Sequence, residues 1–367
     1  LQIKTQHVIF GGLTARLFTF FSVKAVRKYP LFLCKNGRFA RMRRAHIQTE
    51  DNIQKEDFML TKKDLLGLYD VSAEEITEIL DRAEEMKALL NKGRKAESLL
   101  KGRALITLFY ENSTRTRTSF ELAGKYLGAS EVNVAAASSS VQKGETLIDT
   151  GKTLDAMKID FIAIRHPLAG APKLLAENVH ASVINAGDGM NEHPTQALLD
   201  MFSMREKFGK IAGLKVAILG DIKHSRVAKS NLFGLKKLGA EVYMYAPATL
   251  MPKDIQKLGA HVCGSMEEAI EGAHCVMGLR IQLERQKGGL FPSLSEYSKF
   301  YGVKDGMLSL ADKDAIIMHP GPVNRGIELT PSLIDGENSV ICEQVTNGLA
   351  TRMAILTLLK EYREKNL

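Results

Sequence analysis

The feature that most constrains the fold is a repeated alternation of short apolar segments with longer segments patterned as helices. Strands and helices that alternate in this way form parallel sheets covered by helices. The segments expected to be strands are 104–110, 132–135, 161–164, 182–185, 215–219, 241–245, 274–279 and 315–318. Four precede and four follow a predicted helix that begins near Pro194. We therefore expect an α/β protein with two doubly wound parallel-sheet domains joined by helices.

The domain boundaries follow from that central helix, with a junction around 194–209. The chain has 367 residues, which at roughly 150 residues per domain suggests two domains. We expect a first domain at 58–194 and a second at 195–345. A final segment, 346–367, is patterned as an amphipathic helix and is expected to pack back on the first domain.

The first 57 residues differ from the rest of the chain in composition. They hold 11 Lys and Arg against 4 Asp and Glu, so they carry seven of the eight net positive charges. We expect 1–57 to be a basic extension that is disordered or not native, with the biological start at Met59. A transit peptide, which would imply an organellar location, and an arm for nucleic acid or anionic membranes remain open.

The composition excludes several classes of partner for the body of the chain. Residues 58–367 are nearly neutral, so nucleic-acid binding is not expected. No segment approaches the ~18 to 20 apolar residues that span a bilayer, so a membrane protein is not expected. The four cysteines are scattered without Cys-x-x-Cys spacing, and we expect no metal site and a cytoplasmic location.

Polar loops follow the predicted strands, where open α/β sheets bind their ligands. The first is Ser113-Thr114-Arg115-Thr116-Arg117, at the start of a predicted helix. Free backbone N–H groups, hydroxyls and the helix dipole would face one small volume there, which favours a phosphate site. The loop lacks Gly-x-x-x-x-Gly-Lys, so a nucleoside triphosphate is not expected.

Three further loops belong to the first half. Lys143 lies in a serine-containing, Gly-flanked loop that is equally compatible with a solvated surface. Arg165 ends a strand and could bind a phosphate or polarise a carbonyl, although a structural ion pair is the alternative. His193-Pro194-Thr195-Gln196 brings an imidazole and an amide to a predicted helix start.

The second half offers groups suited to a carboxylate and an amine. Gly220-Asp221 follows a strand without the glycines of a dinucleotide site, and Arg226 stands at a helix start instead. Arg280 and Gln282 would point the same way by strand alternation. Gly321 and Pro322, in His319-Pro320-Gly321-Pro322, would present backbone carbonyls, although a plain turn remains open. Such a cleft fits transfer of an activated acyl-like group from a phosphate to an acceptor.

From about Leu60 onward these motifs resemble the aspartate/ornithine carbamoyltransferase family, and within it the catalytic chains of the aspartate branch. The resemblance rests on Phe109 to Arg117, the Ser-Ser-Ser-Val-Gln-Lys-Gly-Glu loop, Arg165-His166-Pro167, His193 to Gln196 and Arg280-Ile281-Gln282. The ornithine branch typically carries His-Cys-Leu-Pro where this chain has His319-Pro320-Gly321-Pro322. A Ser-Met-Gly motif of that branch is also absent.

The resemblance implies a reaction and a set of roles. Carbamoyl phosphate and L-aspartate would give N-carbamoyl-L-aspartate and phosphate, the committed step of de novo pyrimidine biosynthesis, with no cofactor. The residues implied to bind carbamoyl phosphate are Ser113, Thr114, Arg115, Thr116, Ser139, Lys143, Arg165, His193 and Gln196. Those implied to bind aspartate are Lys143, Arg226, Arg280 and Gln282. Catalysis would rest on Arg115, Thr116, Lys143, Arg165 and His193.

The resemblance also implies a homotrimer, in which Ser139 and Lys143 reach into the active site of a neighbouring subunit. Whether a separate regulatory chain binds is left open. Two other functions also remain open. One is a carbamoyltransferase with another amine acceptor such as ornithine, and the other is a catalytically silent scaffold paralogue.

Overall fold

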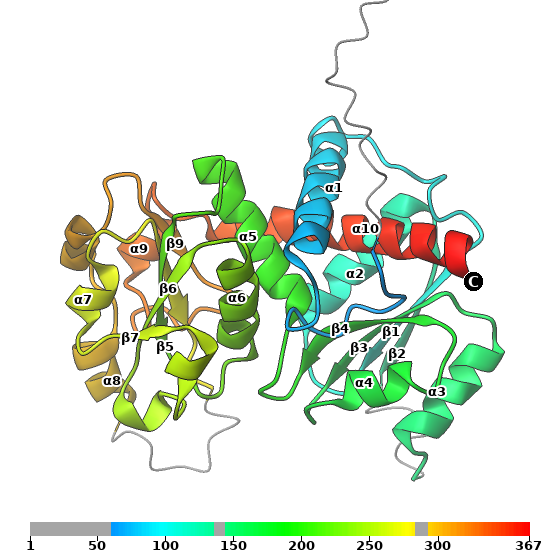
Figure 1. The fold of residues 1–367 in the computed structure, drawn as a ribbon, viewed down its shortest axis with the longest axis horizontal. Helices are drawn as coiled ribbons and strands as arrows, with labels where there is room; N and C mark the ends of the chain where they lie inside the picture. Colours follow the sequence, from blue (N-terminus) through cyan, green and yellow to red (C-terminus); the bar gives the residue numbers. More distant parts are fainter. Residues whose placement is uncertain (1–59, 136–143, 283–292) are drawn as a thin grey trace, which may run out of the picture. The chain divides into compact units, whose positions relative to one another are not determined.

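The structure, a computed structural model, describes residues 60–135, 144–282 and 293–367. These lie in one compact unit, Asp57–Leu367. The unit contains two parallel sheets flanked by helices (Figure 1). The predicted fold class is therefore confirmed.

The first sheet has the strand order β2-β1-β3-β4, and every neighbouring pair is parallel. Its strands are β1 (Ala104–Phe109), β2 (Ser130–Ala135), β3 (Phe161–His166) and β4 (Ser182–Asp188). Its helices are α1 (Ala73–Asn91), α2 (Thr114–Leu127), α3 (Leu147–Ala156) and α4 (Ala171–Ala176). Helix α1 begins with a capping box formed by Ser72 and Glu75, and its buried residues recur on one face.

The second sheet has the order β7-β6-β5-β8-β9 and is also parallel throughout. Its strands are β5 (Lys215–Gly220), β6 (Glu241–Tyr245), β7 (His261–Val262), β8 (Cys275–Leu279) and β9 (Ile316–Met318). Its helices are α6 (Arg226–Lys237), α7 (Met266–Ile270), α8 (Leu294–Tyr301) and α9 (Pro331–Asp335). Short 3-10 helices span η3 (Ala248–Leu250), η4 (Ile255–Leu258) and η6 (Asp305–Leu310). The sequence predicted four strands here, and the fifth, β7, is an edge strand of only two residues.

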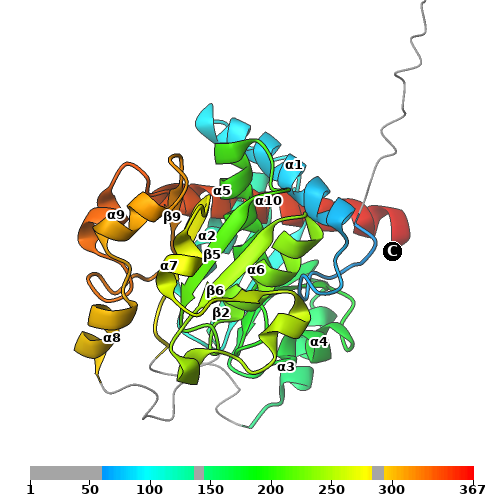
Figure 2. The same cartoon turned by 60° about the vertical axis from the view of Figure 1, so that its left-hand side comes forward.

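Two long helices connect the halves. Helix α5 (Pro194–Phe208) leads from the first sheet to the second, and α10 (Ile341–Asn366) follows the second sheet and packs against α1, α5 and α2. Figure 2 shows α5 and α10 behind the strands of the second sheet. Helix α10 begins five residues earlier than predicted. It is also not amphipathic, because almost every residue from Asn347 to Leu359 is buried.

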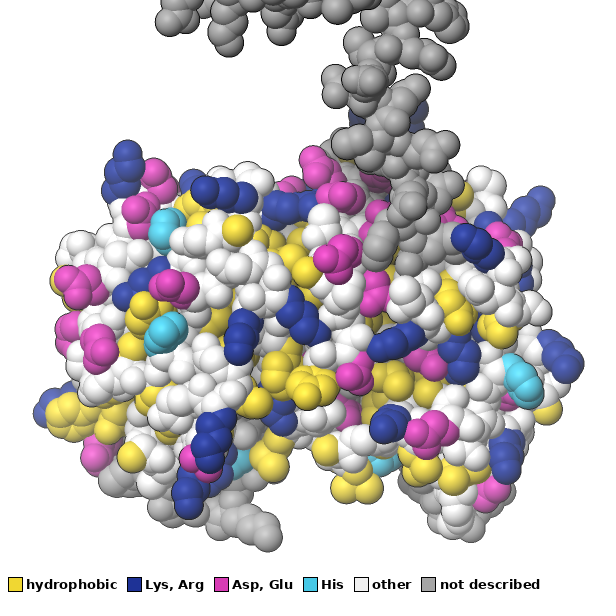
Figure 3. All heavy atoms as spheres, viewed as in Figure 1, with side chains coloured by type: hydrophobic (Ala, Val, Ile, Leu, Met, Phe, Trp, Pro, Cys, Tyr) yellow, Lys and Arg dark blue, Asp and Glu magenta, His cyan; other side chains and the backbone are white. Residues whose placement is uncertain are grey.

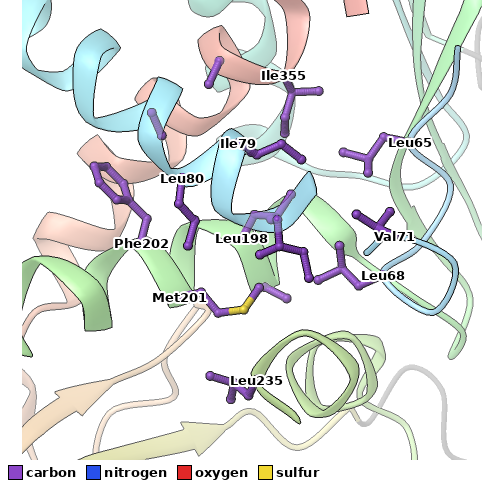
Figure 4. Close-up of a cluster of buried hydrophobic side chains, with 14 of the residues drawn as sticks. Leu65, Leu68, Val71, Ile79, Leu80, Leu198, Met201, Phe202, Leu235 and Ile355 are labelled. Atoms are coloured by element: carbon purple, nitrogen blue, oxygen red, sulfur yellow. The ribbon is translucent and has the colours of Figure 1, made fainter. Parts of the chain in front are cut away.

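A continuous apolar core lies where these helices meet. Figure 4 shows Ile79 and Leu80 of α1 beside Leu198 and Phe202 of α5, with Ile355 of α10 nearby. All five side chains are at most 1% exposed. At roughly 1.5 to 3 kcal/mol for each fully buried large apolar side chain, this cluster is a major contribution to the stability of the connection.

The surface carries charges of both signs. On the face seen in Figure 3, Lys and Arg side chains are interspersed with Asp and Glu. Among the helices that the structure describes, none is both long and apolar enough to cross a bilayer.

Candidate active site

A pocket of about 550 Å³ lies at the carboxyl ends of strands from both sheets. Twelve residues predicted from the sequence line it: Ser113, Thr114, Arg115, Thr116, Arg165, His193, Gln196, Arg226, Arg280, Gln282, Gly321 and Pro322. The lining also includes Ser119, Gln344 and Arg352, which the sequence did not single out, and His319, to which the sequence assigned no role of its own. Ser139 and Lys143 lie outside the described residues. The pocket thus brings together every predicted site residue that the structure describes.

The first wall of the pocket is the start of α2. Ser113 is its N-cap, with extended backbone, but its side chain makes no capping bond. Its hydroxyl instead accepts a hydrogen bond from Arg165 Nη1 at 3.3 Å. The first N–H groups of α2 therefore have no side-chain cap at Ser113 and can meet an anion, which the helix dipole also favours.

Arg165 reaches this wall from β3. The register between β3 and β4 shifts between Ile164 and His166, where Arg165 alone lies opposite Ala186 and Gly187, so the extra residue of this irregularity is on β4. Glu111, just after β1, accepts from Arg165 Nε at 3.1 Å, and its side chain is only partly exposed.

Glu111 also joins the two sheets. Its Oε2 atom accepts from Arg226 Nη2 at 2.8 Å, and Arg226 begins α6 in the second half of the chain. Burial, followed by the positive charge of Arg165, lowers the pKa of Arg226 to about 10. Arg226 remains a cation at neutral pH, and Glu111 offsets part of the repulsion between the two guanidiniums. This role of Glu111 was not predicted from the sequence, although an acidic residue beside so many arginines was a usable signal.

The second wall contains Arg280 and Gln282, directly after β8. Arg280 Nη2 donates to Gln282 Oε1 at 3.2 Å, and Ile281 between them is fully buried, as alternation predicts. Two buried carboxylates hold this segment by its backbone. Glu328 accepts from Ile281 N at 3.2 Å, and Asp221 accepts from Gln282 N at 3.2 Å.

The loop after β9 closes the pocket against Arg115. A Cβ atom built on Gly321 would lie 1.8 Å from Arg115 Nη1, so the guanidinium packs directly against this glycine. Burial, followed by the charge of Arg280, lowers the pKa of Arg115. Arginines from both walls therefore act on one volume, and together they favour a ligand with several negative charges.

His319 begins this loop and is 2% exposed. Its Nδ1 atom accepts from Gly321 N at 2.8 Å, so in the neutral ring the proton is on Nε2. Burial, together with the charges of Arg115 and Arg280, lowers the pKa of His319 to about 3. The imidazole is therefore neutral at ordinary pH and can act as a hydrogen-bond donor but not as a proton-donating imidazolium.

The low pKa of His319 predicts a specific loss of stability in acid. Folded His319 binds fewer protons than the unfolded side chain, whose pKa is about 6.5, so its contribution is complete above that value and decreases as pH falls toward 3. Between pH 7.5 and 5 the free energy of unfolding should fall by about 2 kcal/mol more in the wild type than in His319→Gln. Urea titrations of both proteins at the two pH values measure this difference. Equal losses would contradict the low pKa.

A second cavity, of about 790 Å³, shares Asn112 and Arg165 with the pocket. Glu111, Gly189 and Lys229 are among its other lining residues. It lacks the uncapped helix start and the Arg280 and Gln282 pair. The arrangement of donors therefore assigns the chemistry to the 550 Å³ pocket.

Comparisons with known proteins agree with this geometry. Residues 63–206 match the carbamoyl-phosphate-binding domain of the aspartate/ornithine carbamoyltransferases, and 212–359 match their aspartate/ornithine-binding domain. The aspartate carbamoyltransferase catalytic subunit of Ruminiclostridium cellulolyticum is 64% identical over 300 residues, covering 82% of this chain and 96% of that one. That of Caldanaerobacter subterraneus is 58% identical over 304 residues, covering 83% of this chain and all of that one.

Solved structures with the same architecture come from both branches of the family. The aspartate transcarbamoylase of Trypanosoma cruzi, in complex with carbamoyl phosphate and aspartate, has a TM-score of 0.74 at 31% identity, over 80% of this chain and 95% of that one. The ornithine carbamoyltransferase of Pyrococcus furiosus also has a TM-score of 0.74 at 31% identity, over 82% of this chain and 98% of that one. The motifs, the two-walled pocket and these matches together show that the chain belongs to the aspartate/ornithine carbamoyltransferase family, with the catalytic chains of its aspartate branch.

Proposed function

We propose that this protein transfers the carbamoyl group of carbamoyl phosphate to the amino group of L-aspartate. The products are N-carbamoyl-L-aspartate and phosphate, and the step is the committed one of de novo pyrimidine biosynthesis. The observation that carries the proposal is a pocket with an uncapped helix start and Arg115 on one wall and the Arg280 and Gln282 pair on the other. One wall suits a phosphate and the other a carboxylate.

Carbamoyl phosphate binds at the first wall in this proposal. The start of α2, from Ser113 to Thr116, takes the phosphate, and Arg165, His193 and Gln196 surround the carbamoyl group. The cationic lining supports a dianionic ligand, since Arg115 and Arg165 both border the same space. Ser139 and Lys143 complete this set as residues of a neighbouring subunit, which makes the proposed assembly a homotrimer.

Aspartate binds at the second wall, where Arg280 and Gln282 hold its carboxylates together with Arg226. Of the N–H groups of Arg226, one bonds to Glu111 and one to the Gly189 carbonyl at 3.4 Å. Its other N–H groups can bind substrate, because a guanidinium has five donors. Backbone carbonyls at Gly321 and Pro322 accept from the amine or amide.

The proposed reaction forms one bond and breaks one. The aspartate nitrogen attacks the carbamoyl carbon, the tetrahedral intermediate collapses, and the bond to the phosphate oxygen breaks. Thr116, Arg165 and His193 stabilise the developing oxyanion, while Arg115 and Lys143 neutralise the leaving phosphate. Preorganised donors of this kind contribute roughly 3 to 4 kcal/mol each. The amine proton leaves with the phosphate.

Phosphate release from carbamoyl phosphate tests this proposal, with the full chain and either L-aspartate or L-ornithine as acceptor. Release is expected with L-aspartate and not above background with L-ornithine, because the ornithine ammonium would lie beside Arg280. Turnover with L-ornithine alone would replace the proposed acceptor. No turnover with either would support the scaffold alternative. Sedimentation of the active protein tests the trimer, and cell fractionation tests the cytoplasmic location that we also propose.

A further inference from the structure

Asp200 is a fully buried carboxylate that does not line the pocket but touches residues that do. It lies in α5 and is 0% exposed. Its Oδ1 atom accepts from Gln196 Nε2 at 2.9 Å and from Gln344 Nε2 at 2.7 Å. Its Oδ2 atom accepts from Asn231 Nδ2 at 2.8 Å. Three amide groups, from α5, α6 and α10, therefore converge on one side chain.

Asp200 is charged when the protein works near neutral pH. Burial raises the pKa of Asp200 to about 6, while the three amide donors and the positive charge of Arg352 favour the ionised form. Arg352 is itself 3% exposed and donates to Ser119 Oγ at 3.0 Å, on α2. An ionised carboxylate accepts hydrogen bonds and cannot donate them.

Because the carboxylate of Asp200 can only accept hydrogen bonds, it determines the orientation of the side-chain amides of Gln196 and Gln344. Both direct their NH₂ groups toward Asp200, so both direct their oxygens elsewhere. The Gln344 oxygen accepts from His319 N at 3.0 Å, which ties the loop after β9 to the same carboxylate. Gln196 lines the pocket at the start of α5, so its oxygen is the amide atom left for a ligand.

Among the described residues of the first wall, the Gln196 oxygen is an amide acceptor that cannot itself donate, whereas the hydroxyls of Ser113, Thr114 and Thr116 can do either. Arg115 and Arg165, like the helix N–H groups, are donors, and the neutral His319 ring also donates from Nε2. The carbamoyl group is distinguished from other acyl groups by its NH₂, which needs an acceptor. A buried N–H group without an acceptor costs its full free energy of desolvation.

We propose that Asp200 is a positioning residue that holds the Gln196 oxygen toward the carbamoyl NH₂ and so makes the pocket selective for carbamoyl phosphate over acyl phosphates that lack this group. The inference rests on the proposed function, because it assigns carbamoyl phosphate to the first wall. It goes beyond that function by naming what selects the donor substrate.

The test compares the affinity for carbamoyl phosphate with that for acetyl phosphate, in which a methyl group replaces the NH₂. Calorimetry with the full chain at pH 8 and without an acceptor measures both. The wild type should prefer carbamoyl phosphate. Asp200→Leu, which removes the carboxylate at similar volume, should weaken carbamoyl phosphate roughly 5- to 10-fold and acetyl phosphate less than about 2-fold, on the scale of one hydrogen bond.

Two further variants separate positioning from general damage. Asp200→Asn should keep most of the preference, since its oxygen can still accept from Gln196. Its NH₂ would face Asn231 Nδ2, so the Asn231 amide must turn over to present Oδ1, which has no hydrogen-bond partner among the described residues. Ser203→Ala is the matched control in the same helix. Ser203 is 3% exposed and accepts from Asn347 at 2.9 Å, so its loss should lower stability and leave both affinities unchanged.

Each outcome decides the role of Asp200. If Asp200→Leu weakens both phosphates equally, or leaves the preference intact, the positioning role is wrong. If that variant does not fold, Asp200→Ala, which retains helix propensity, is judged by the same ratio. A wild type that prefers carbamoyl phosphate but does not carbamoylate aspartate would overturn the proposed transfer and not the role of Asp200. A wild type without the preference would overturn only that role.

Discussion

Replacing Arg115 with alanine is expected to lower kcat for carbamoyl transfer at least ~10²-fold, the scale for losing one donor that acts on developing charge. Arg115 belongs to the first turn of α2, lines the pocket and packs against Gly321 from the opposite wall. Negative charge grows on the phosphate as the bond to carbon breaks, so the lost interaction is stronger in the transition state than in the bound substrate. Steady-state phosphate release at saturating aspartate measures the effect.

Arg117→Ala is the matched control for this prediction. Arg117 lies on the same helix and pairs with Glu121 at 3.8 Å, but it does not line the pocket. The Arg117→Ala variant should therefore have a kcat within a few-fold of the wild-type value. If Arg115→Ala retained near-normal kcat, or if both variants lost the same activity, Arg115 would have no direct part in transfer.

Most of the fold could be predicted because its elements carry local signals. The interior strands, such as β5 and β8, are continuous apolar runs, and α1 begins with a capping box. The edge strand β7 was not predicted, because two residues are too few to show the alternating pattern of a strand. Helix α10 was predicted to be amphipathic, but it is buried among α1, α2 and α5, and no local pattern reveals burial on every side.

The site could be predicted where a single residue lies at the carboxyl end of a strand, as Arg165 does near the end of β3, or directly after a strand, as Arg280 does. The topology brings those loop residues to one edge, so each can be found separately. What the sequence did not reveal were pairings between distant elements. Glu111 bonds to Arg226 across 115 positions, and Asp200 bonds to Gln344 across 144. A glutamine within a helix has no sequence signal for the direction in which its amide is turned.

Replacing Arg280 with alanine is expected to raise the KM for aspartate on the order of 10²-fold, from two charge-assisted hydrogen bonds at roughly 1.5 kcal/mol or more each. The position of Arg280 is fixed, because Glu328 and Asp221 accept hydrogen bonds from the backbone N–H groups of the two residues that follow it. The carboxylates of aspartate are present in both the ground state and the transition state, so the loss should act mainly on KM. Saturation curves for aspartate at fixed, saturating carbamoyl phosphate measure it.

Two comparisons make the Arg280 prediction specific to the second wall. Lys223→Ala removes an exposed cation from the loop after β5 of the same sheet, and it should leave aspartate saturation unchanged. The affinity of Arg280→Ala for carbamoyl phosphate should stay within a few-fold of the wild type, because the helix start and Arg165 on the first wall remain. If instead aspartate saturation were unchanged while carbamoyl phosphate binding was lost, the two walls would have been assigned the wrong way round.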